Sequence, residues 1–190
     1  MTGRRPRIIV LTAPSGSGKT TIANRVMEAM PELRFSVSAT TRARRPHEQE
    51  GVHYHFVTCE AFGEMVDAGE MLEYEEVYPG RYYGTLRSEL NRSAEDGPVL
   101  LDIDVRGALK VKEFFGDDAL IIFVRPPSQD ELERRLRLRA TEDEATIAVR
   151  LERARHELTF SGEADVVIDN DDLFQAVSET LTVIRRFLVA

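Results

Sequence analysis

Hydrophobic residues dominate four short runs along the chain, at 8–11, 99–103, 120–124 and 166–168, and Asp102 is the one polar residue within them. Each run has the length of a strand, is rich in β-branched residues and lacks the polar alternation of a half-exposed strand. Segments with helical spacing separate the runs from one another. This pattern predicts an α/β fold in which a parallel β-sheet core is flanked by helices.

Two kinds of signal indicate further helices in the second half of the chain. An apolar stripe at helical spacing runs from Leu173 to Leu188 and predicts a C-terminal helix docked on the body. Ser128 with Glu131 and Thr141 with Glu144 have the spacing of capping boxes, which satisfy free N–H groups in the first turn of a helix.

The pattern changes after residue 35 to short alternating segments at 35–38, 53–57 and 71–77, separated by polar turns. We expect these segments to form a small inserted unit that is largely antiparallel. The chain is then one domain with three approximate regions: a core (1–34, 86–125 and 160–190), the inserted unit (35–85) and a helical region (126–159).

Composition and charge narrow the possible functions. The chain has 190 residues, of which 42% are hydrophobic, and its net charge is −8. An acidic chain offers no global attraction for nucleic acid or anionic lipid, so a bound anion must meet a local basic site. The apolar runs are far shorter than the roughly 20 residues that span a bilayer. Cys59 is the single cysteine, which excludes an internal disulfide. We expect a cytoplasmic protein that binds neither nucleic acid nor membrane.

A glycine-rich segment between the first strand run and a helical pattern at 20–30 predicts a phosphate-binding loop. It fits the pattern G-x-x-x-x-G-K-[ST] except at its first position. Its small residues let backbone N–H groups converge on phosphate oxygens, its lysine can reach the β and γ phosphates of a nucleoside triphosphate, and its threonine can ligate Mg²⁺. The loop consists of Ala13, Pro14, Ser15, Gly16, Ser17, Gly18, Lys19 and Thr20.

A second candidate site follows in the segment 36–46, where Arg42, Arg44 and Arg45 lie beside several hydroxyl side chains. In an acidic protein this is a local anion site, and Arg42 with Arg45 could neutralise the phosphate of an acceptor. The alternative is a solvated basic loop.

Six motifs in order along the chain make it resemble the guanylate kinases. They are APSGSGKT at 13–20, FSVSATTRARRPHE at 35–48, YYGT at 82–85, LLDIDVRG at 100–107, RPPSQDELERRL at 125–136 and DNDD at 169–172. The resemblance implies a P-loop NTPase fold with a small GMP-binding subdomain (35–85) and a helical lid with its adjoining helix (126–159). It also implies Mg²⁺-dependent, in-line transfer of a phosphoryl group from ATP to GMP, and also to dGMP, in purine metabolism, by a monomer or a small homo-oligomer.

The resemblance further implies the residues that bind GMP. A carboxylate suits guanine because it can accept hydrogen bonds from both N1–H and the 2-amino group, and adenine offers neither donor on that edge. Without the resemblance, Glu73 would be interpreted as a solvent-facing acid on a strand. The implied phosphate ligands are Arg42, Arg45, Tyr54 and Tyr83, with Glu48 supporting the arginines, and the implied base ligands are Ser38, Glu73 and Thr85.

Asp102 and Asp104 are two residues apart on a predicted strand, so both point to one face at its carboxyl end. We expect Asp102 to lie near the metal and GMP, as a metal ligand together with Thr20. For Asp104 an N-cap of the following helix and a direct role in the site stay equally open.

Three arginines in the helical region are the predicted lid residues. Arg135 and Arg139 are four residues apart on one helical face, and Arg150 lies on the next helix. The resemblance implies that they close over ATP and stabilise the charge on the transferred phosphoryl group, that Arg135 and Arg139 also bind ATP, and that Asn170 lies on the adenine side. Ala140 departs from the glycine usual after the lid arginine. The alternative is a surface ion pair between Glu131 and Arg135.

Two other functions are compatible with parts of this pattern. Guanylate-kinase-like domains also serve as catalytically silent peptide-binding modules, but such modules typically lack the intact phosphate loop that Lys19 and Thr20 complete here. A related ribosyl bisphosphate kinase is the second alternative, and the base-binding set of Ser38, Glu73 and Thr85 argues against it.

Overall fold

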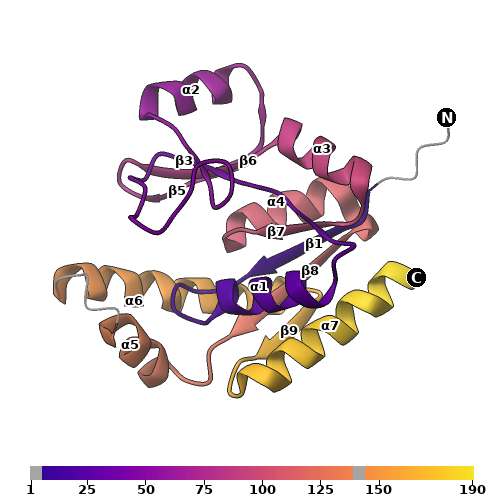
Figure 1. The fold of residues 1–190 in the computed structure, drawn as a ribbon. Coiled ribbons are helices and arrows are strands. Elements are labelled where there is room, and N and C mark those ends of the chain that lie inside the picture. The colour runs from indigo at the N-terminus through magenta and orange to yellow at the C-terminus, as the bar shows by residue number, and fades with distance from the viewer. Residues whose placement is uncertain (1–5, 139–143) are drawn as a thin grey trace.

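The computed structural model describes residues 6–138 and 144–190. Its central sheet consists of five parallel strands in the order β2 (Arg34–Phe35), β7 (Val99–Asp102), β1 (Ile8–Thr12), β8 (Ala119–Arg125) and β9 (Val166–Asp169). The four apolar runs of the sequence are four of these strands, so the predicted parallel α/β core is confirmed. Figure 1 shows the sheet in the middle of the molecule.

Helices cover both faces of the central sheet. The helices α1 (Lys19–Ala29) and α7 (Leu173–Val189) pack on the face that receives Ile9 and Leu11 of β1. The helices α3 (Arg87–Asp96) and α4 (Val105–Phe115) pack on the opposite face, against Ile8 and Val10. Because helices cover both faces of the sheet, the side chains on both faces of a strand are mostly buried and apolar, which explains the apolar runs in the sequence.

The inserted unit is a second sheet covered by one helix, and it lies above the central sheet in Figure 1. Its strands follow the order β4 (His55–Phe56), β3 (Ala39–Thr40), β6 (Arg81–Leu86) and β5 (Met71–Tyr78), and its helix is α2 (Cys59–Asp67). The pairings of β6 with β3 and β5 are antiparallel, whereas β3 and β4 are parallel. The unit is therefore largely antiparallel, as expected.

The segment expected as one short strand at 35–38 is divided between the two sheets. Phe35 ends β2 and pairs with Leu100 of the central sheet, and the Ser36 N–H donates a hydrogen bond to the Leu100 carbonyl at 3.1 Å. Ala39 begins β3 in the small sheet. The alternation of residues 35–38 could not show this, because it does not distinguish one partner strand from another.

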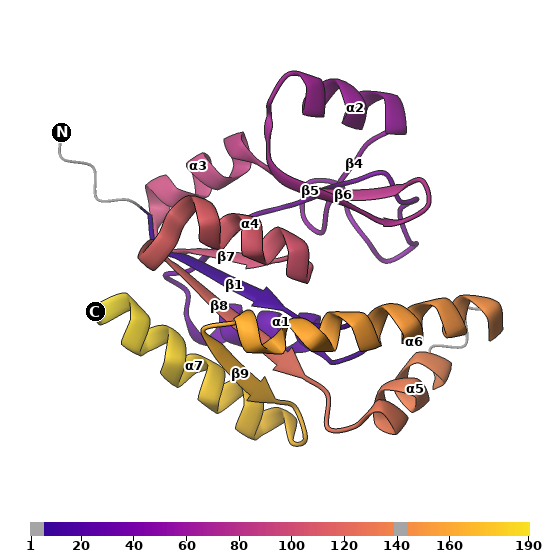
Figure 2. The same cartoon turned by 180° about the vertical axis from the view of Figure 1, so that it is seen from behind.

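The helices α5 (Gln129–Leu138) and α6 (Glu144–Thr159) form a pair on the side of the molecule where β1 and β8 end, as Figures 1 and 2 show. They meet through Leu132, Leu136 and Ala154. The predicted cap of α5 is present, because Ser128 Oγ accepts from the Glu131 N–H at 3.1 Å.

Short 3₁₀ turns at Gly116–Asp118 and Phe160–Glu163 precede β8 and β9. The other predicted cap, Thr141 with Glu144, includes a residue outside the described ranges. Within those ranges, no helix has the length and apolarity needed to cross a bilayer.

Candidate active site

Residues 13–18 connect β1 to α1 in a tight loop. Gly16 and Gly18 have φ angles of 94° and 93°, in the left-handed region that favours glycine. Gly18 is the N-cap of α1 and has no side chain, so no cap side chain accepts from the N–H groups of the first turn. A helix start of this kind can bind phosphate.

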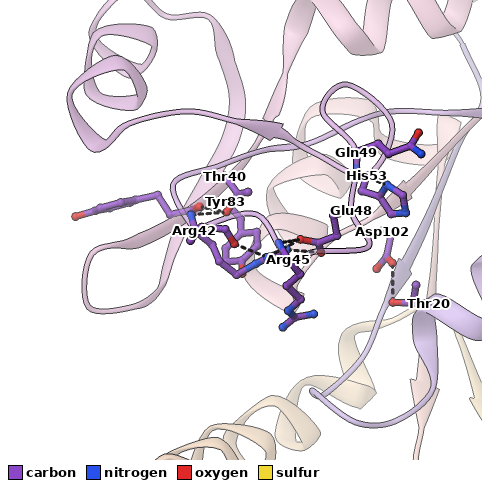
Figure 3. A network of polar contacts seen from close by, with 11 residues as sticks. Thr20, Thr40, Arg42, Arg45, Glu48, Gln49, His53, Tyr83 and Asp102 are labelled. Atoms are coloured by element: carbon purple, nitrogen blue, oxygen red, sulfur yellow. Dashed lines mark hydrogen bonds and ion pairs between the residues drawn. The ribbon is translucent and has the colours of Figure 1, made fainter. Parts of the chain in front are cut away.

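Lys19 and Thr20 meet the carboxyl end of β7. The Lys19 Nζ lies 2.7 Å from Asp102 Oδ1 and donates to the Ile103 carbonyl at 2.6 Å. The Thr20 hydroxyl donates to Asp102 Oδ2 at 3.4 Å (Figure 3). Since Leu11 of β1 is in register with Asp102 of β7, the parallel pairing delivers this carboxylate to the loop.

Asp104, two residues after Asp102, is the N-cap of α4. Its Oδ1 accepts a hydrogen bond from the Gly107 N–H at 3.0 Å, so the capping interpretation is confirmed. Asp104 also lines the cleft described below. A cap and a place in the site are therefore not alternatives for this residue.

The basic segment forms an ordered cluster around Glu48, shown in Figure 3. Two nitrogens of Arg42 each lie 2.8 Å from a Glu48 oxygen, and Glu48 Oε2 also accepts from the Arg45 N–H at 2.7 Å. The Arg42 Nε donates to the Tyr83 hydroxyl at 3.2 Å. The hydrogen bonds with Arg42 lower the pKa of Glu48 to about 2. A solvated loop would not show these contacts, so the segment is an ordered cluster that is able to bind an anion.

Tyr54 stacks beside this cluster. The guanidinium of Arg42 lies 5.2 Å from the centre of the Tyr54 ring, and Tyr54 packs edge-on against Tyr83. Burial raises the pKa of the Tyr54 hydroxyl, which therefore stays protonated and able to donate.

Glu73 lies on β5 of the inserted sheet. Its side chain is 4% exposed, and its Oε1 accepts from the Thr85 hydroxyl of β6 at 2.6 Å. Burial raises the pKa of Glu73 to about 7. The interpretation of Glu73 as a solvent-facing acid is therefore wrong, because the inserted sheet packs this strand against α4.

One cleft joins these groups. It has a volume of about 250 Å³ and extends from the phosphate loop to the inserted sheet and α6. Arg42 and Thr85 do not line the cleft themselves. Arg42 donates a hydrogen bond to Tyr83 and Thr85 donates one to Glu73, and both acceptors line the cleft. The predicted site residues that line the cleft directly are Ala13, Pro14, Ser15, Gly16, Gly18, Lys19, Thr20, Ser38, Arg45, Tyr54, Glu73, Tyr83, Asp102 and Arg150.

Arg135 and Asn170 both contact the phosphate loop at Ser17. The buried Asn170 amide donates to the Ser17 carbonyl at 2.7 Å, and Arg135 NH1 reaches the same carbonyl at 3.5 Å. Arg135 Nε also donates to Glu131 at 2.8 Å, so the predicted ion pair and the approach to the loop coexist. Hydrogen bonds with Arg134 and Arg135 lower the pKa of Glu131 to about 2. Arg139 and Ala140 lie outside the described residues.

Tyr78, Arg153 and Glu157 are among the cleft-lining residues that were not identified from the sequence. Arg153 Nε donates to Glu157 at 2.7 Å and its NH1 to the Val77 carbonyl, while the guanidinium groups of Arg150 and Arg153 lie 5.8 and 5.6 Å from the Tyr78 ring. Arg153 follows Arg150 by three residues on one helical face, a signal that could have identified it. Burial raises the pKa of Glu157.

Comparison with known proteins finds similarity along nearly the whole chain. Residues 5–187 match the family model described as guanylate kinase. A protein named guanylate kinase from Salinibacter ruber is 64% identical over 181 residues, which cover 95% of this chain and 96% of that protein. Another from Bacteroides thetaiotaomicron is 47% identical over 189 residues, covering 99% of this chain and 91% of that protein.

Solved structures extend the comparison to the fold. The crystal structure of guanylate kinase from Anaplasma phagocytophilum superposes with a TM-score of 0.79 at 34% identity and covers 95% of this chain and 85% of that chain. A shikimate kinase from Bacteroides thetaiotaomicron, at 20% identity and a TM-score of 0.55, shares the fold. The family match over nearly the whole chain and the high identity to its members establish that the chain belongs to the guanylate kinase family.

Proposed function

We propose that the protein transfers the γ-phosphoryl group of ATP in line to a phosphate oxygen of GMP or dGMP, with Mg²⁺, and yields ADP and the nucleoside diphosphate. Membership of the family supports phosphorylation of GMP by ATP in general. The observation that carries the finer proposal is the single cleft, which is lined by Lys19 of the phosphate loop, Arg45 of the basic cluster and buried Glu73.

On the ATP side, the first-turn N–H groups of α1 and Lys19 bind the β and γ phosphates. Arg135 and Asn170 bind the part of ATP that lies beyond these phosphates, because both side chains contact the Ser17 carbonyl of the loop. Catalysis then needs positioning and charge neutralisation, and no side-chain nucleophile, because the acceptor phosphate is already ionised.

On the GMP side, Arg45 and Arg42 bind the acceptor phosphate together with the hydroxyl groups of Tyr54 and Tyr83. Glu48 orients Arg42 through the two hydrogen bonds of 2.8 Å. Two anionic substrates repel each other, and Lys19, Arg45 and Arg150 lining one cleft provide cations around both.

The base binds against Glu73, with Thr85 and Ser38 beside it. A carboxylate that accepts from N1–H and from the 2-amino group of guanine leaves adenine without a matching donor. These assigned contacts reach the base and the phosphate, and none depends on the ribose 2′-hydroxyl, so we expect dGMP to be accepted as well.

Thr20 and Asp102 provide the oxygen atoms that Mg²⁺ prefers, with Thr20 Oγ1 and Asp102 Oδ2 3.4 Å apart beside the phosphate loop. No cluster of three or more His, Cys, Asp and Glu side chains suitable for a metal occurs in the described part of the chain. This donor set suits an ion held by one carboxylate, one hydroxyl and substrate phosphates. Bound Mg²⁺ would supply neutralisation of phosphate charge.

The test is ADP formation from ATP with GMP, dGMP, IMP, AMP, UMP or no acceptor, each with Mg²⁺ or with excess chelator. We expect fast turnover with GMP and dGMP only, and loss of turnover with chelator. A chiral γ-phosphorothioate donor would test the in-line step, since one displacement inverts the configuration at phosphorus. Absence of turnover with every acceptor, or retention of configuration, would contradict the proposal.

A further inference from the structure

Gly107 lies in the first turn of α4, in the motif LLDIDVRG, and none of the site roles above uses it. Its backbone is helical, and its φ angle is not in the left-handed region that favours glycine. In a helix, glycine is less favourable than alanine by about 0.5–1 kcal/mol. Local backbone chemistry therefore favours alanine at this position, and the reason for glycine must lie in what surrounds it.

The surrounding group is the carboxylate of Glu73. A Cβ atom built on Gly107 would lie 2.5 Å from Glu73 Oε2 and 3.0 Å from Glu73 Cδ, closer than non-bonded carbon and oxygen atoms approach. The next neighbour is Ile103 Cδ1 at 3.4 Å, an ordinary contact. Glu73 is therefore the group that a side chain at position 107 would displace.

Glu73 has little freedom to move away. Its other oxygen, Oε1, is held by the Thr85 hydroxyl at 2.6 Å, and the side chain is 4% exposed. The Gly107 N–H is itself held by Asp104 at 3.0 Å, which fixes the first turn of α4. A carboxylate pushed from the helix would have to leave Thr85 or enter the cleft.

We propose that Gly107 is a specificity-determining residue, because its missing side chain lets the Glu73 carboxylate rest against α4 at the depth that guanine recognition requires. The inference rests on the proposed function of Glu73. A carboxylate displaced toward the cleft cannot meet N1–H and the 2-amino group together. The contact to the 2-amino group separates GMP from IMP, which lacks that group, so discrimination between these two acceptors reports the position of the carboxylate.

The test is Gly107→Ala, with the Michaelis constants of GMP and ATP and the ratio of kcat/KM for GMP over IMP as readouts. We expect the KM for GMP to rise about tenfold or more and the GMP-over-IMP ratio to fall, as is usual when one recognition contact is lost. The KM for ATP should stay within about twofold, because Gly107 lies on the GMP side. A GMP KM and a GMP-over-IMP ratio both equal to wild type would overturn the inference.

Gly63→Ala is the matched control. Gly63 is also a helical glycine, in α2, and nothing lies within 4 Å of a Cβ built there. This variant adds the same methyl group and the same gain in helix propensity without a clash, so its kinetics should equal those of wild type. Equal effects of the two substitutions on the GMP KM would contradict the proposal.

A shortened acid provides the rescue test. Glu73→Asp removes one methylene, so in that background the added methyl at position 107 should change the KM for GMP less than about twofold, a coupling that a double-mutant cycle measures. If Gly107→Ala does not fold, recovery of a cooperative thermal transition in Gly107→Ala/Glu73→Asp supports the inference, and failure to recover it overturns it.

Glu73→Gln separates the inference from the proposed function. An unchanged GMP-over-IMP ratio in that variant would show that the carboxylate does not read guanine, and both would fall. A lowered ratio in Glu73→Gln with a normal ratio in Gly107→Ala would overturn the inference alone and leave the proposed function of Glu73 standing.

Discussion

Lys19 of the phosphate loop and Asp102 of the neighbouring strand β7 form an ion pair, with the Lys19 Nζ 2.7 Å from Asp102 Oδ1. The ammonium group also donates to the Ile103 carbonyl at 2.6 Å. Two acceptors thus hold a flexible side chain over the cleft that it lines. The loop lysine is therefore positioned by β7, and in the proposed function its charge lies beside the substrate phosphates before any rearrangement is needed.

Replacing Lys19 by alanine should lower kcat by at least about 10²-fold, because a positioned donor to the transferred phosphoryl group is lost. The fold should persist, since the side chain contributes to the cleft and not to the apolar core. A coupled ADP assay and a thermal melt measure both effects. Arg25→Ala removes an exposed cation from the same helix and should behave as wild type. Undiminished turnover of Lys19→Ala would contradict the role of the loop.

Replacing Glu48 by glutamine should lower the free energy of unfolding by about 2 kcal/mol at neutral pH, because Arg42 loses its counter-charge in a largely buried site. The KM for GMP should rise as well, since Arg42 is no longer oriented. Denaturant unfolding and steady-state kinetics measure these changes. Arg25→Ala disrupts an exposed pair and provides the comparison, with an expected loss below about 1 kcal/mol. If Glu48→Gln lost no more unfolding free energy than Arg25→Ala, the cluster around Glu48 would not contribute to stability.

The same pair predicts a pH dependence. Glu48 has a pKa of about 2 in the folded protein, below its ordinary value of 4.5, because of the hydrogen bonds with Arg42. The unfolded chain therefore binds more protons between these values, and the stabilisation is complete above pH 4.5 and lost as the pH falls toward 2. The stability difference between wild type and Glu48→Gln should shrink over this interval. A difference independent of pH would contradict the shift.

Glu73 should show the opposite dependence. Burial raises its pKa from 4.5 to about 7, so the folded protein binds the extra proton and loses stability as the pH rises between these values. Glu73→Gln should remove this loss and be more stable than wild type above pH 7. In wild type, kcat/KM for GMP should rise through pH 7 as the carboxylate ionises. If the pH profile of kcat/KM for GMP in Glu73→Gln kept the same inflection, the inflection would belong to another group.

Replacing Arg135 by alanine should raise the KM for ATP about tenfold or more and lower kcat, while the KM for GMP stays near wild type. Arg134→Ala is the control, because Arg134 also pairs with Glu131 but its side chain is 61% exposed, against 27% for Arg135. The two variants lose the same charge and the same ion-pair partner. If both change the KM for ATP equally, the effect belongs to the helix and not to the contact of Arg135 with Ser17.

Local sequence patterns were sufficient to predict the central strands, the phosphate loop and one helix cap. A buried parallel strand must be apolar on both faces, so residues 8–11 and 120–124 could be assigned from the sequence alone. The phosphate loop was equally readable, because its glycines, Lys19 and Thr20 act through a backbone geometry that neighbouring residues create. The cap at Ser128 was found for the same reason.

Residues that depend on two distant elements could not be assigned in this way. Without the resemblance, the sequence predicts that Glu73 is an exposed acid on a strand. The same strand carries Glu75 and Glu76, and the pattern along a strand does not show which of its acids a distant element covers. Burial of Glu73 arises where α4 approaches β5 at Gly107, a contact between segments far apart in the chain. Tyr78 lines the cleft together with Arg150 and Arg153 of α6, whose guanidinium groups lie beside its ring.

The parallel core, the phosphate loop and, through the motifs, the family could thus be predicted, because each depends on residues that are neighbours along the chain. The folded arrangement was needed to show that Asp104 both caps α4 and lines the cleft, that Glu73 is buried against Gly107, and that Arg153 lines the cleft. Burial and hydrogen bonding are properties of a three-dimensional environment, and a one-dimensional pattern records them only where the periodicity of a single helix or strand repeats them.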